Sequence, residues 1–222
     1  MQAQVNMQNF NKTFLYHNIE MITLSIKYPC ILLYNNPNAQ WHINNQIMIE
    51  VNEFYNYVVN QLYNQAVQSY IYATENNFPF HGFQAIMEYT ITYNDNCFLS
   101  YYNDKYEYTG GAHGMTIRSS NTFDLRTGTK IPLYCYFKKG TDYKGLLTKE
   151  IIKQVNNQLQ ENPGIYFNNY AELIVTNFSE DNYFLTPEGL SIYFQHYDIA
   201  PYSTGIVVFT IPYETIGYSP SC

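Results

Sequence analysis

The segment YTGGAHG, residues 108–114, places a histidine among glycines, a combination that could bind phosphate, hold a metal or take part in catalysis. Phosphate binding requires GxxxxGK[ST] between a strand and a helix, or GxGxxG at the start of a helix. Neither spacing is present, and the residues that follow, MTIRSSNTFD, read as a strand. We therefore expect no phosphate site at residues 110–114.

Potential metal ligands are not clustered along the chain. No two histidines stand two to five positions apart; they are His17, His42, His81, His113 and His196. The cysteines form no CxxC pair, which argues against a zinc knuckle and a thioredoxin-like redox motif; they are Cys30, Cys97, Cys135 and Cys222. We predict no metal and no cofactor, while a three-histidine site assembled by folding stays open. A disulfide such as Cys97 to Cys135 and free cysteines packed in a sheet are both compatible with the sequence.

Motifs for covalent or acid–base catalysis are also missing. There is no GxSxG segment, and Ser119 and Ser120 are explained as polar positions on a strand. The carboxylates of Asp104 and Glu107 belong to a hairpin arm, and Asp124 precedes a turn, so no paired-carboxylate pattern of a glycosidase stands out. We predict no catalytic residues.

The remaining interpretation is binding by rigid loops. Consecutive glycines open backbone conformations closed to other residues, and His113 offers a donor and an acceptor; alternatively, the glycines only turn a strand corner. A second loop, HYDIAPYSTG, contains Pro201, which restrains the backbone, and Tyr202, whose amphipathic ring suits a binding surface. The predicted partner-binding residues are Gly110, Gly111, His113, Gly114, Pro201 and Tyr202.

Composition limits the classes of partner. Of 222 residues, 46 % are hydrophobic, enough for a core, and 25 are tyrosines, which favour sheets and recognition surfaces unless they only reflect an AT-rich genome. The formal net charge of -7 argues against nucleic acid, because Lys138 and Lys139 form the only weak basic group. No apolar stretch is long enough for a membrane segment, so the leader of a secreted protein would lie outside this sequence.

The elements that position the first loop follow from periodicity. Residues 13–34 alternate as a half-buried strand, and apolar residues then recur every three or four positions from Ile43 towards Glu75, as in a long helix. Two alternating aromatic runs, residues 83–95 and 97–111, form a hairpin, and a strand over residues 115–124 follows. The glycine segment therefore connects two strands.

The second half is also predicted to contain strands and an amphipathic helix. A helix over residues 149–159 begins near Asp142 and ends at residues 162–164, a hairpin spans residues 182–194, and the apolar last strand, residues 205–213, is expected in the centre of its sheet. The predicted class is α+β, with two antiparallel sheets each packed against one amphipathic helix. We divide the chain into an amino-terminal unit, residues 1–124, and a carboxy-terminal β-α-β unit, residues 125–222.

Several of these segments match a known pattern in order: YTGGAHG with TFDLRTGTKIPLYCYF, then FLTPEGLSIYFQHYDIAPYSTG, then VVFTIPY. Over residues 13–213 the chain resembles the paired domains of unknown function in the extracytoplasmic part of the anti-sigma-V factor RsiV and in the amino-terminal region of the peptidoglycan deacetylase PdaC. The resemblance implies one unit before about residue 110 and another after it.

The resemblance also implies a noncatalytic, extracytoplasmic module, secreted or in the cell envelope. In the RsiV-like anti-sigma members the module binds lysozyme, and the resemblance lends an inhibitor-like surface to residues 110–114 and 200–205. Since no sigma-binding domain, membrane segment or deacetylase Asp and His motif is found, signalling and deacetylation are not carried over. We predict a protein partner such as lysozyme, or peptidoglycan; the alternative is a cell-wall glycan-active hydrolase using His113 with a carboxylate such as Asp104.

Overall fold

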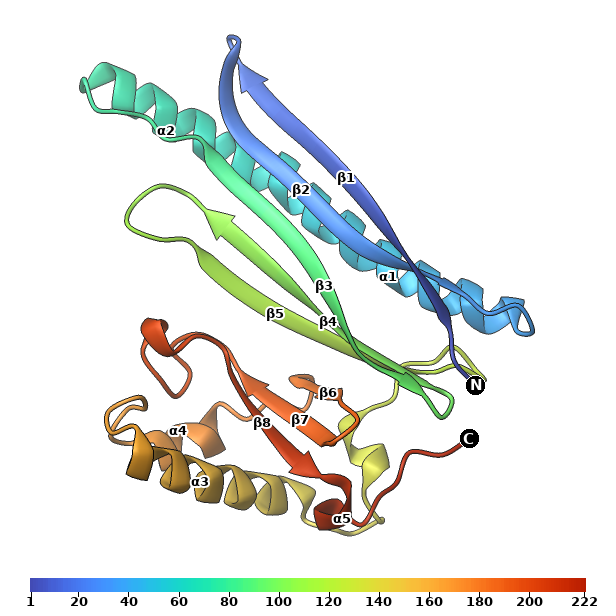
Figure 1. The fold of residues 1–222 in the computed structure, drawn as a ribbon. Coiled ribbons are helices and arrows are strands. Elements are labelled where there is room, and N and C mark those ends of the chain that lie inside the picture. Colours follow the sequence, from blue (N-terminus) through green and yellow to red (C-terminus); the bar gives the residue numbers. More distant parts are fainter. The chain divides into compact units, whose positions relative to one another are not determined.

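The computed structural model describes residues 1–222, which form two compact units. The N-unit comprises Gln4–Tyr89 and Asn103–Ile117, and the C-unit comprises Met1–Ala3, Thr90–Tyr102 and Arg118–Cys222. One sheet has the strand order β1-β2-β3-β4-β5 and the other the order β6-β7-β8 (Figure 1). The α+β class with two sheets, predicted from the sequence, is confirmed. The division into residues 1–124 and 125–222 stays a prediction.

The chain begins with a long antiparallel hairpin. β1, Gln4–Tyr16, pairs with β2, Ile19–Leu32, and the two turn residues His17 and Asn18 have φ values of 49° and 63°. In β2 the alternation expected from the sequence is confirmed, because Ile22, Leu24 and Ile26 are buried. The single strand expected over residues 13–34 is wrong, because the turn at His17 and Asn18 divides that range between the end of β1 and β2. The rest of β1 was not expected, since its side chains are mostly exposed and polar and carry little alternation to reveal a strand.

A helical segment follows, made of α1, Pro37–Tyr57, a π-helical turn η1, Val58–Leu62, and α2, Tyr63–Glu75. It starts where Asn36 accepts a hydrogen bond from the amide of Ala39 at 3.2 Å and Pro37 occupies the first turn. The buried side chains lie on one stripe, and α1 packs against β2; the stripe is Ile43, Ile47, Val51, Phe54, Val58, Leu62 and Ala66. The long amphipathic helix predicted from the sequence is confirmed.

The next strand changes the sheet from antiparallel to mixed. β3, Phe83–Asp95, runs parallel to β2, with Ile22 opposite Phe83 and Ile26 opposite Met87. The helix returns the chain to the end of the sheet at which β2 began, so that β3 can run in the same direction as β2. The prediction of a purely antiparallel sheet is therefore wrong for this pair. β4, Phe98–Tyr108, and β5, Met115–Asp124, complete the sheet, and β5 has the bounds expected from the sequence.

The C-unit places its helices on a small antiparallel sheet. α3, Tyr143–Glu161, starts at Asp142, whose carboxylate accepts a hydrogen bond from the amide of Gly145 at 3.0 Å. α4, Tyr170–Thr176, follows, and the sheet is formed by β6, Tyr183–Leu185, β7, Gly189–Phe194, and β8, Val207–Pro212. Short helices are η2, Leu133–Tyr136, η3, Tyr202–Thr204, and α5, Tyr213–Ile216.

β7, rather than β8, is the central strand of this sheet. All six residues of β7 are buried, whereas β8 lies at the edge and leaves Val208 exposed. The expectation of a central last strand is wrong, because the apolar character of β8 comes from one face: Phe209 and Ile211 point into the core around α3. An edge strand can be as apolar as a central one when its inner face packs on a helix.

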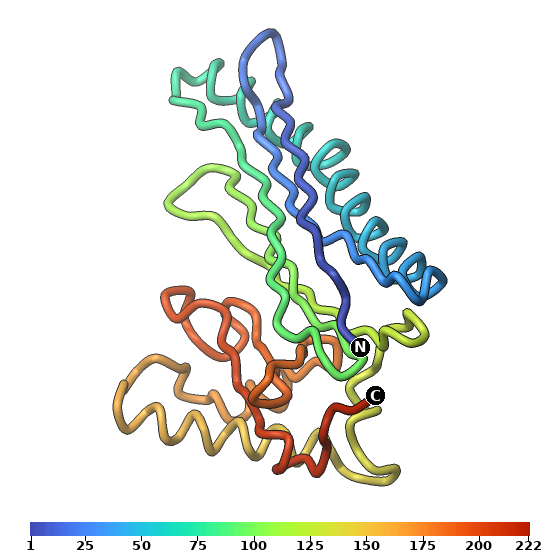
Figure 2. Tube along the Cα trace, turned by 45° about the vertical axis from the view of Figure 1, so that its right-hand side comes forward, coloured from blue at the N-terminus to red at the C-terminus, as the bar shows by residue number.

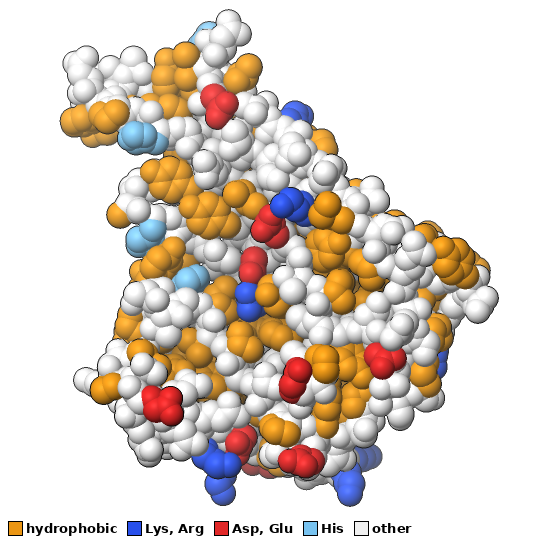
Figure 3. All heavy atoms as spheres, in the orientation of Figure 1, with side chains coloured by type: hydrophobic (Ala, Val, Ile, Leu, Met, Phe, Trp, Pro, Cys, Tyr) orange, Lys and Arg blue, Asp and Glu red, His pale blue; other side chains and the backbone are white.

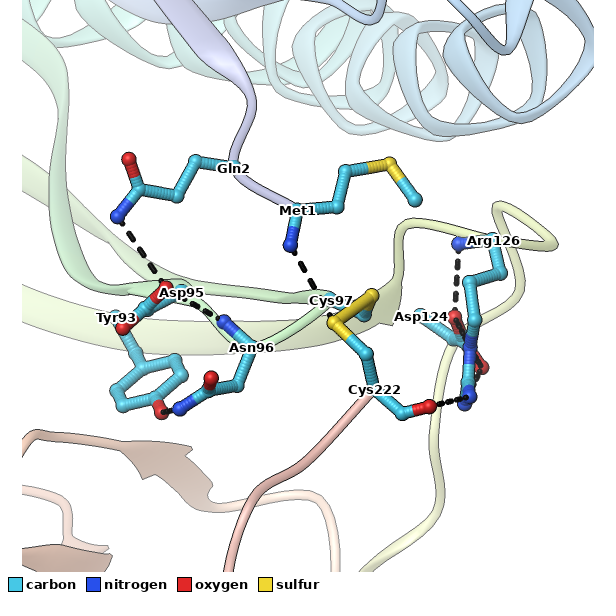
Figure 4. Close-up of a disulfide and its surroundings, with 9 residues drawn as sticks. All are labelled: Met1, Gln2, Tyr93, Asp95, Asn96, Cys97, Asp124, Arg126 and Cys222. Carbon is cyan, nitrogen blue, oxygen red and sulfur yellow. Dashed lines mark hydrogen bonds and ion pairs between the residues drawn. A yellow bond between two sulfur atoms is a disulfide. The ribbon is translucent and has the colours of Figure 1, made fainter.

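A disulfide connects Cys97 and Cys222 within the C-unit (Figure 4). The Cα atoms are 5.2 Å apart, and the termini of the chain lie beside one another (Figure 2), where the amide of Cys97 donates to the carbonyl of Met1 at 3.0 Å. The possible Cys97–Cys135 pair is wrong: Cys135 is exposed and, like Cys30, is a free thiol. The distant tail is the partner because it folds back onto the β3–β4 turn, which no local pattern encodes.

Candidate functional site

The first candidate loop, residues 109–114, is named the glycine loop and joins β4 to β5 in the N-unit. Gly110 and Gly111 have φ values of 94° and 89°, which side-chain-bearing residues rarely adopt. A Cβ atom at either position would meet nothing within 4 Å, so the backbone conformation, and not crowding, requires glycine there. The hydroxyl of Tyr108 donates to the carbonyl of Gly111 at 3.1 Å and holds the loop to the strand.

Gly114 has a different function in this loop. It is buried, and a Cβ atom at this position would lie 2.4 Å from the carbonyl oxygen of Glu107 and 2.5 Å from the ring of Tyr106. These distances are shorter than van der Waals contact, so the backbone just before β5 can pass close to Tyr106 only because residue 114 has no side chain. Gly114 therefore fixes the base of the loop that presents its neighbour His113.

His113 lies at the surface of the glycine loop. The residue is exposed, and its Nδ1 atom is 3.0 Å from the carbonyl oxygen of Gly114. Two pockets of the N-unit, between β1, β2 and α1, contain neither His113 nor Asp104. An acid–base pair needs both groups around one enclosed reacting atom, so these pockets do not support the hydrolase alternative.

The second candidate loop, residues 195–205, is named the aromatic loop and lies between β7 and β8 in the C-unit. The ring of Tyr202 stacks on His196 with centroids 4.7 Å apart and lies 5.9 Å from Tyr197. Tyr197 has a φ of 68° and is 50 % exposed. Pro201 precedes η3, and Gly205 ends it at a φ of 83°. The loop thus presents three stacked or neighbouring rings from a restrained backbone.

Hydrogen bonds from several directions hold the aromatic loop. The carboxylate of Asp198 accepts from the amide of Gln195 at 2.8 Å, and its main-chain carbonyl accepts from the side-chain amide of Asn177 at 2.6 Å. The hydroxyl of Thr204 donates to the carbonyl of Ile165 at 2.9 Å. Burial raises the pKa of Asp198, and the hydrogen bond from Gln195 offsets part of this effect. These contacts restrain the backbone that carries the rings, which lowers the entropy lost on binding.

Sequence reasoning missed Arg118 and Gln195 as supports of this loop. The side-chain amide of Gln195 donates to the carbonyl of Arg118 at 2.7 Å and accepts from its amide at 3.0 Å. The guanidinium carbon of Arg118 lies 3.7 Å from the ring centroid of Tyr102, a cation–π contact. Because 77 residues separate Arg118 from Gln195, no local spacing could have indicated the pair.

The six sequence-predicted residues lie in two different units. Gly110, Gly111, His113 and Gly114 belong to the N-unit, and Pro201 and Tyr202 belong to the C-unit. Nearly all of the surface drawn in Figure 3 is hydrophobic or uncharged and polar, with scattered charged side chains. No group of three or more His, Cys, Asp or Glu side chains stands close enough to hold a metal ion, and none of the helices could span a bilayer.

The fold and the loops define a paired α+β module, and comparison with known proteins agrees. Residues 17–116 match the family model described as Deacetylase PdaC, and residues 137–214 match the model described as Protein of unknown function (DUF3298). The first part of the chain is therefore similar to a PdaC-type domain and the second part to a DUF3298 domain, and the family resemblance found in the sequence is confirmed. These two matches indicate a pair of domains, the second of which is described as a protein of unknown function.

Two crystal structures share this fold. A DUF3298 family member from Bacteroides fragilis has a TM-score of 0.72 at 20 % identity, covering 99 % of this chain and 94 % of the other. A DUF3298 family protein from Pseudomonas aeruginosa has a TM-score of 0.61 at 15 % identity, covering 98 % of this chain and 94 % of the other. No curated protein sequence matches the chain.

Proposed function

We propose that the chain is a noncatalytic recognition module of a secreted or cell-envelope protein, and that it binds a cationic protein such as lysozyme. The observation that carries the proposal is the aromatic loop, in which Tyr202, His196 and Tyr197 form a restrained and partly exposed aromatic surface. Tyrosines held by their backbone contribute large contact areas at low entropic cost. The glycine loop adds a second surface with the imidazole of His113.

Charge and disulfide chemistry support the same proposal. The net charge of -7 attracts a cationic partner and raises the rate of association at low salt. The Cys97–Cys222 disulfide suits an oxidising compartment outside the cytoplasm, since thiols inside are kept reduced. Peptidoglycan is the second ligand class, because exposed aromatic rings such as Tyr197 also stack on sugar rings.

The proposal is tested by calorimetric titration of the purified protein with lysozyme at 50 and 150 mM sodium chloride. We expect binding that weakens as salt increases, and a loss of about tenfold or more in affinity for Tyr202→Ala. Tyr134→Ala is the matched control, because Tyr134 is an exposed tyrosine of the same unit outside the aromatic loop. Absence of binding at both salt concentrations would exclude lysozyme, and a pull-down with purified peptidoglycan sacculi then tests the second ligand class.

A further inference from the structure

β1 is an unprotected edge strand of the N-unit. It stands at the end of the sheet order, so its outward N–H and C=O groups have no neighbouring strand. Its pairing with β2 is regular from Gln4 to Phe14, where a bulge follows. Most of its side chains are exposed, and it contains one charged residue, Lys12, and neither proline nor glycine. The unpaired main-chain groups of such an edge strand can form hydrogen bonds with another extended backbone.

Two apolar pockets lie side by side between this edge and α1. The first, of about 270 Å³, includes Gln8, its cross-strand partner Tyr28, and Met48. The second, of about 280 Å³, includes Phe10, its partner Ile26, and again Met48. Phe10 and Met48 are 40 % and 37 % exposed, so the pockets are accessible from solvent. In Figure 1 α1 extends past β1 on the side of the free edge.

The spacing of the pockets matches the side chains of an extended peptide. Gln8 and Phe10 are two residues apart on one face of β1, which separates them by about 7 Å. On the helix, the pocket residues Asn44, Met48 and Asn52 repeat every four positions, or about one turn. A strand added beside β1 would place every second side chain over the two pockets, at the same interval of about 7 Å.

A positive charge continues the row. Lys12 is the next residue of β1 on the face of Gln8 and Phe10, and its Nζ atom donates to the hydroxyl of Tyr55 at 3.1 Å. The same Nζ atom lies 4.7 Å from the ring centroid of Phe14, and no carboxylate pairs with it. Beyond this point the hydroxyl of Tyr63 donates to the carbonyl of Leu15, so the edge is occupied after the bulge.

We propose that this edge binds an extended segment of a partner protein by adding a strand to β1. The segment places two large apolar side chains, at alternate positions, in the two pockets and a carboxylate, at the next alternate position, beside Lys12. Antiparallel addition gives the order Glu-x-Leu-x-Leu along the partner, where leucine stands for any large aliphatic residue. Neither the glycine loop nor the aromatic loop contributes to this surface.

A second copy of the chain fits the row less well. β1 contains no carboxylate, so pairing two copies through β1 would leave both Lys12 charges without an acidic partner. The polar Gln and Asn side chains of β1 would also fill the apolar pockets poorly. Charge complementarity therefore favours an acidic, aliphatic segment.

The test is fluorescence anisotropy with the full chain and a labelled synthetic peptide, Thr-Glu-Thr-Leu-Thr-Leu-Thr. We expect saturable binding below about 1 mM, and a loss of at least about tenfold for Met48→Asp, which puts a charge in both pockets. Lys12→Gln should weaken binding about two- to fivefold. Lys12→Glu should restore binding to a peptide in which lysine replaces glutamate.

Lys27→Gln is the matched control, because Lys27 lies on the opposite face of the same sheet, where it pairs with Glu88 at 2.6 Å. N-methylation of alternate peptide amides should abolish binding in one alternation only, since every second amide faces β1. Circular dichroism checks that each variant is folded. Equal binding of the reversed peptide, or undiminished binding by folded Met48→Asp, would overturn the proposal. A dimer would also overturn it, if sedimentation shows two copies, hydrogen exchange shows slow exchange of the β1 amides, and the peptide no longer binds.

Discussion

Cys97 and Cys222 are joined by a disulfide although 125 residues separate them. Cys97 occupies the turn between β3 and β4 with a φ of 67° and is buried, while Cys222 is the last residue. The main-chain carbonyl of Cys222 also accepts a hydrogen bond from Arg126 at 3.2 Å (Figure 4). The disulfide thus closes a loop that contains nearly the whole C-unit.

Removing this disulfide should lower the stability of the C-unit. Closing a loop of more than 100 residues restricts the unfolded chain, and the loss in Cys222→Ser should be about 2–5 kcal/mol. Urea unfolding of the oxidised protein and of the variant measures the difference. Cys135→Ser is the control, because this exposed free thiol should change the midpoint little. Equal unfolding of Cys222→Ser and the unmodified protein would show that the bond does not form.

Glycine substitutions should separate crowding from backbone strain in the glycine loop. Gly114→Ala should cost about 2 kcal/mol or more, because its Cβ would lie 2.4 Å from the rigid carbonyl of Glu107. Gly111→Ala should cost about 1 kcal/mol, since only its φ of 89° is unfavourable. Thermal unfolding of the two variants gives the order, and a larger loss for Gly111→Ala would contradict the close packing at Gly114.

The stability of the folded protein should depend less on pH in the variant Asp198→Asn. Burial raises the pKa of Asp198 in the folded protein, so its contribution to stability is present at low pH and is lost as the pH rises through that value. Asparagine keeps an oxygen that can accept from the amide of Gln195. The variant should therefore gain stability relative to the natural protein between pH 4 and pH 7. Urea midpoints at both pH values measure this, and an unchanged difference would be evidence against the burial.

The substitution Asp124→Asn should change stability in the opposite direction, with a loss at neutral pH in place of a gain. Hydrogen bonds from the side chain of Arg126, the shortest at 2.7 Å, lower the pKa of Asp124. Its contribution is therefore present above the unfolded pKa, near 4, and is lost as the pH falls through the lower folded value. At neutral pH the variant should lose about 1 kcal/mol or less, because Arg126 is half exposed and solvent screens the pair. The loss should shrink towards pH 3, and a pH-independent loss would argue against the ion pair.

Local patterns in the sequence determined the elements and their inner faces. The alternation around Leu24, the stripe from Ile43 to Ala66 and the cap at Asp142 each depend on neighbours within a few positions, and the structure contains them all. The glycine loop was placed between two strands for the same reason. The alternation of β2 identified it as a strand, but most of β1 could not be identified, because an exposed edge strand needs no apolar face.

Only the tertiary structure decided which distant segments meet. Parallel pairing of β2 with β3, the edge position of β8, the Cys97–Cys222 bond and the contact of Gln195 with Arg118 all join residues far apart in the chain. Periodicity states which face of a segment is buried, but not against which other segment, because many pairings bury the same apolar area. The choice among them comes from chain connectivity and side-chain packing, which act only when the whole chain is folded.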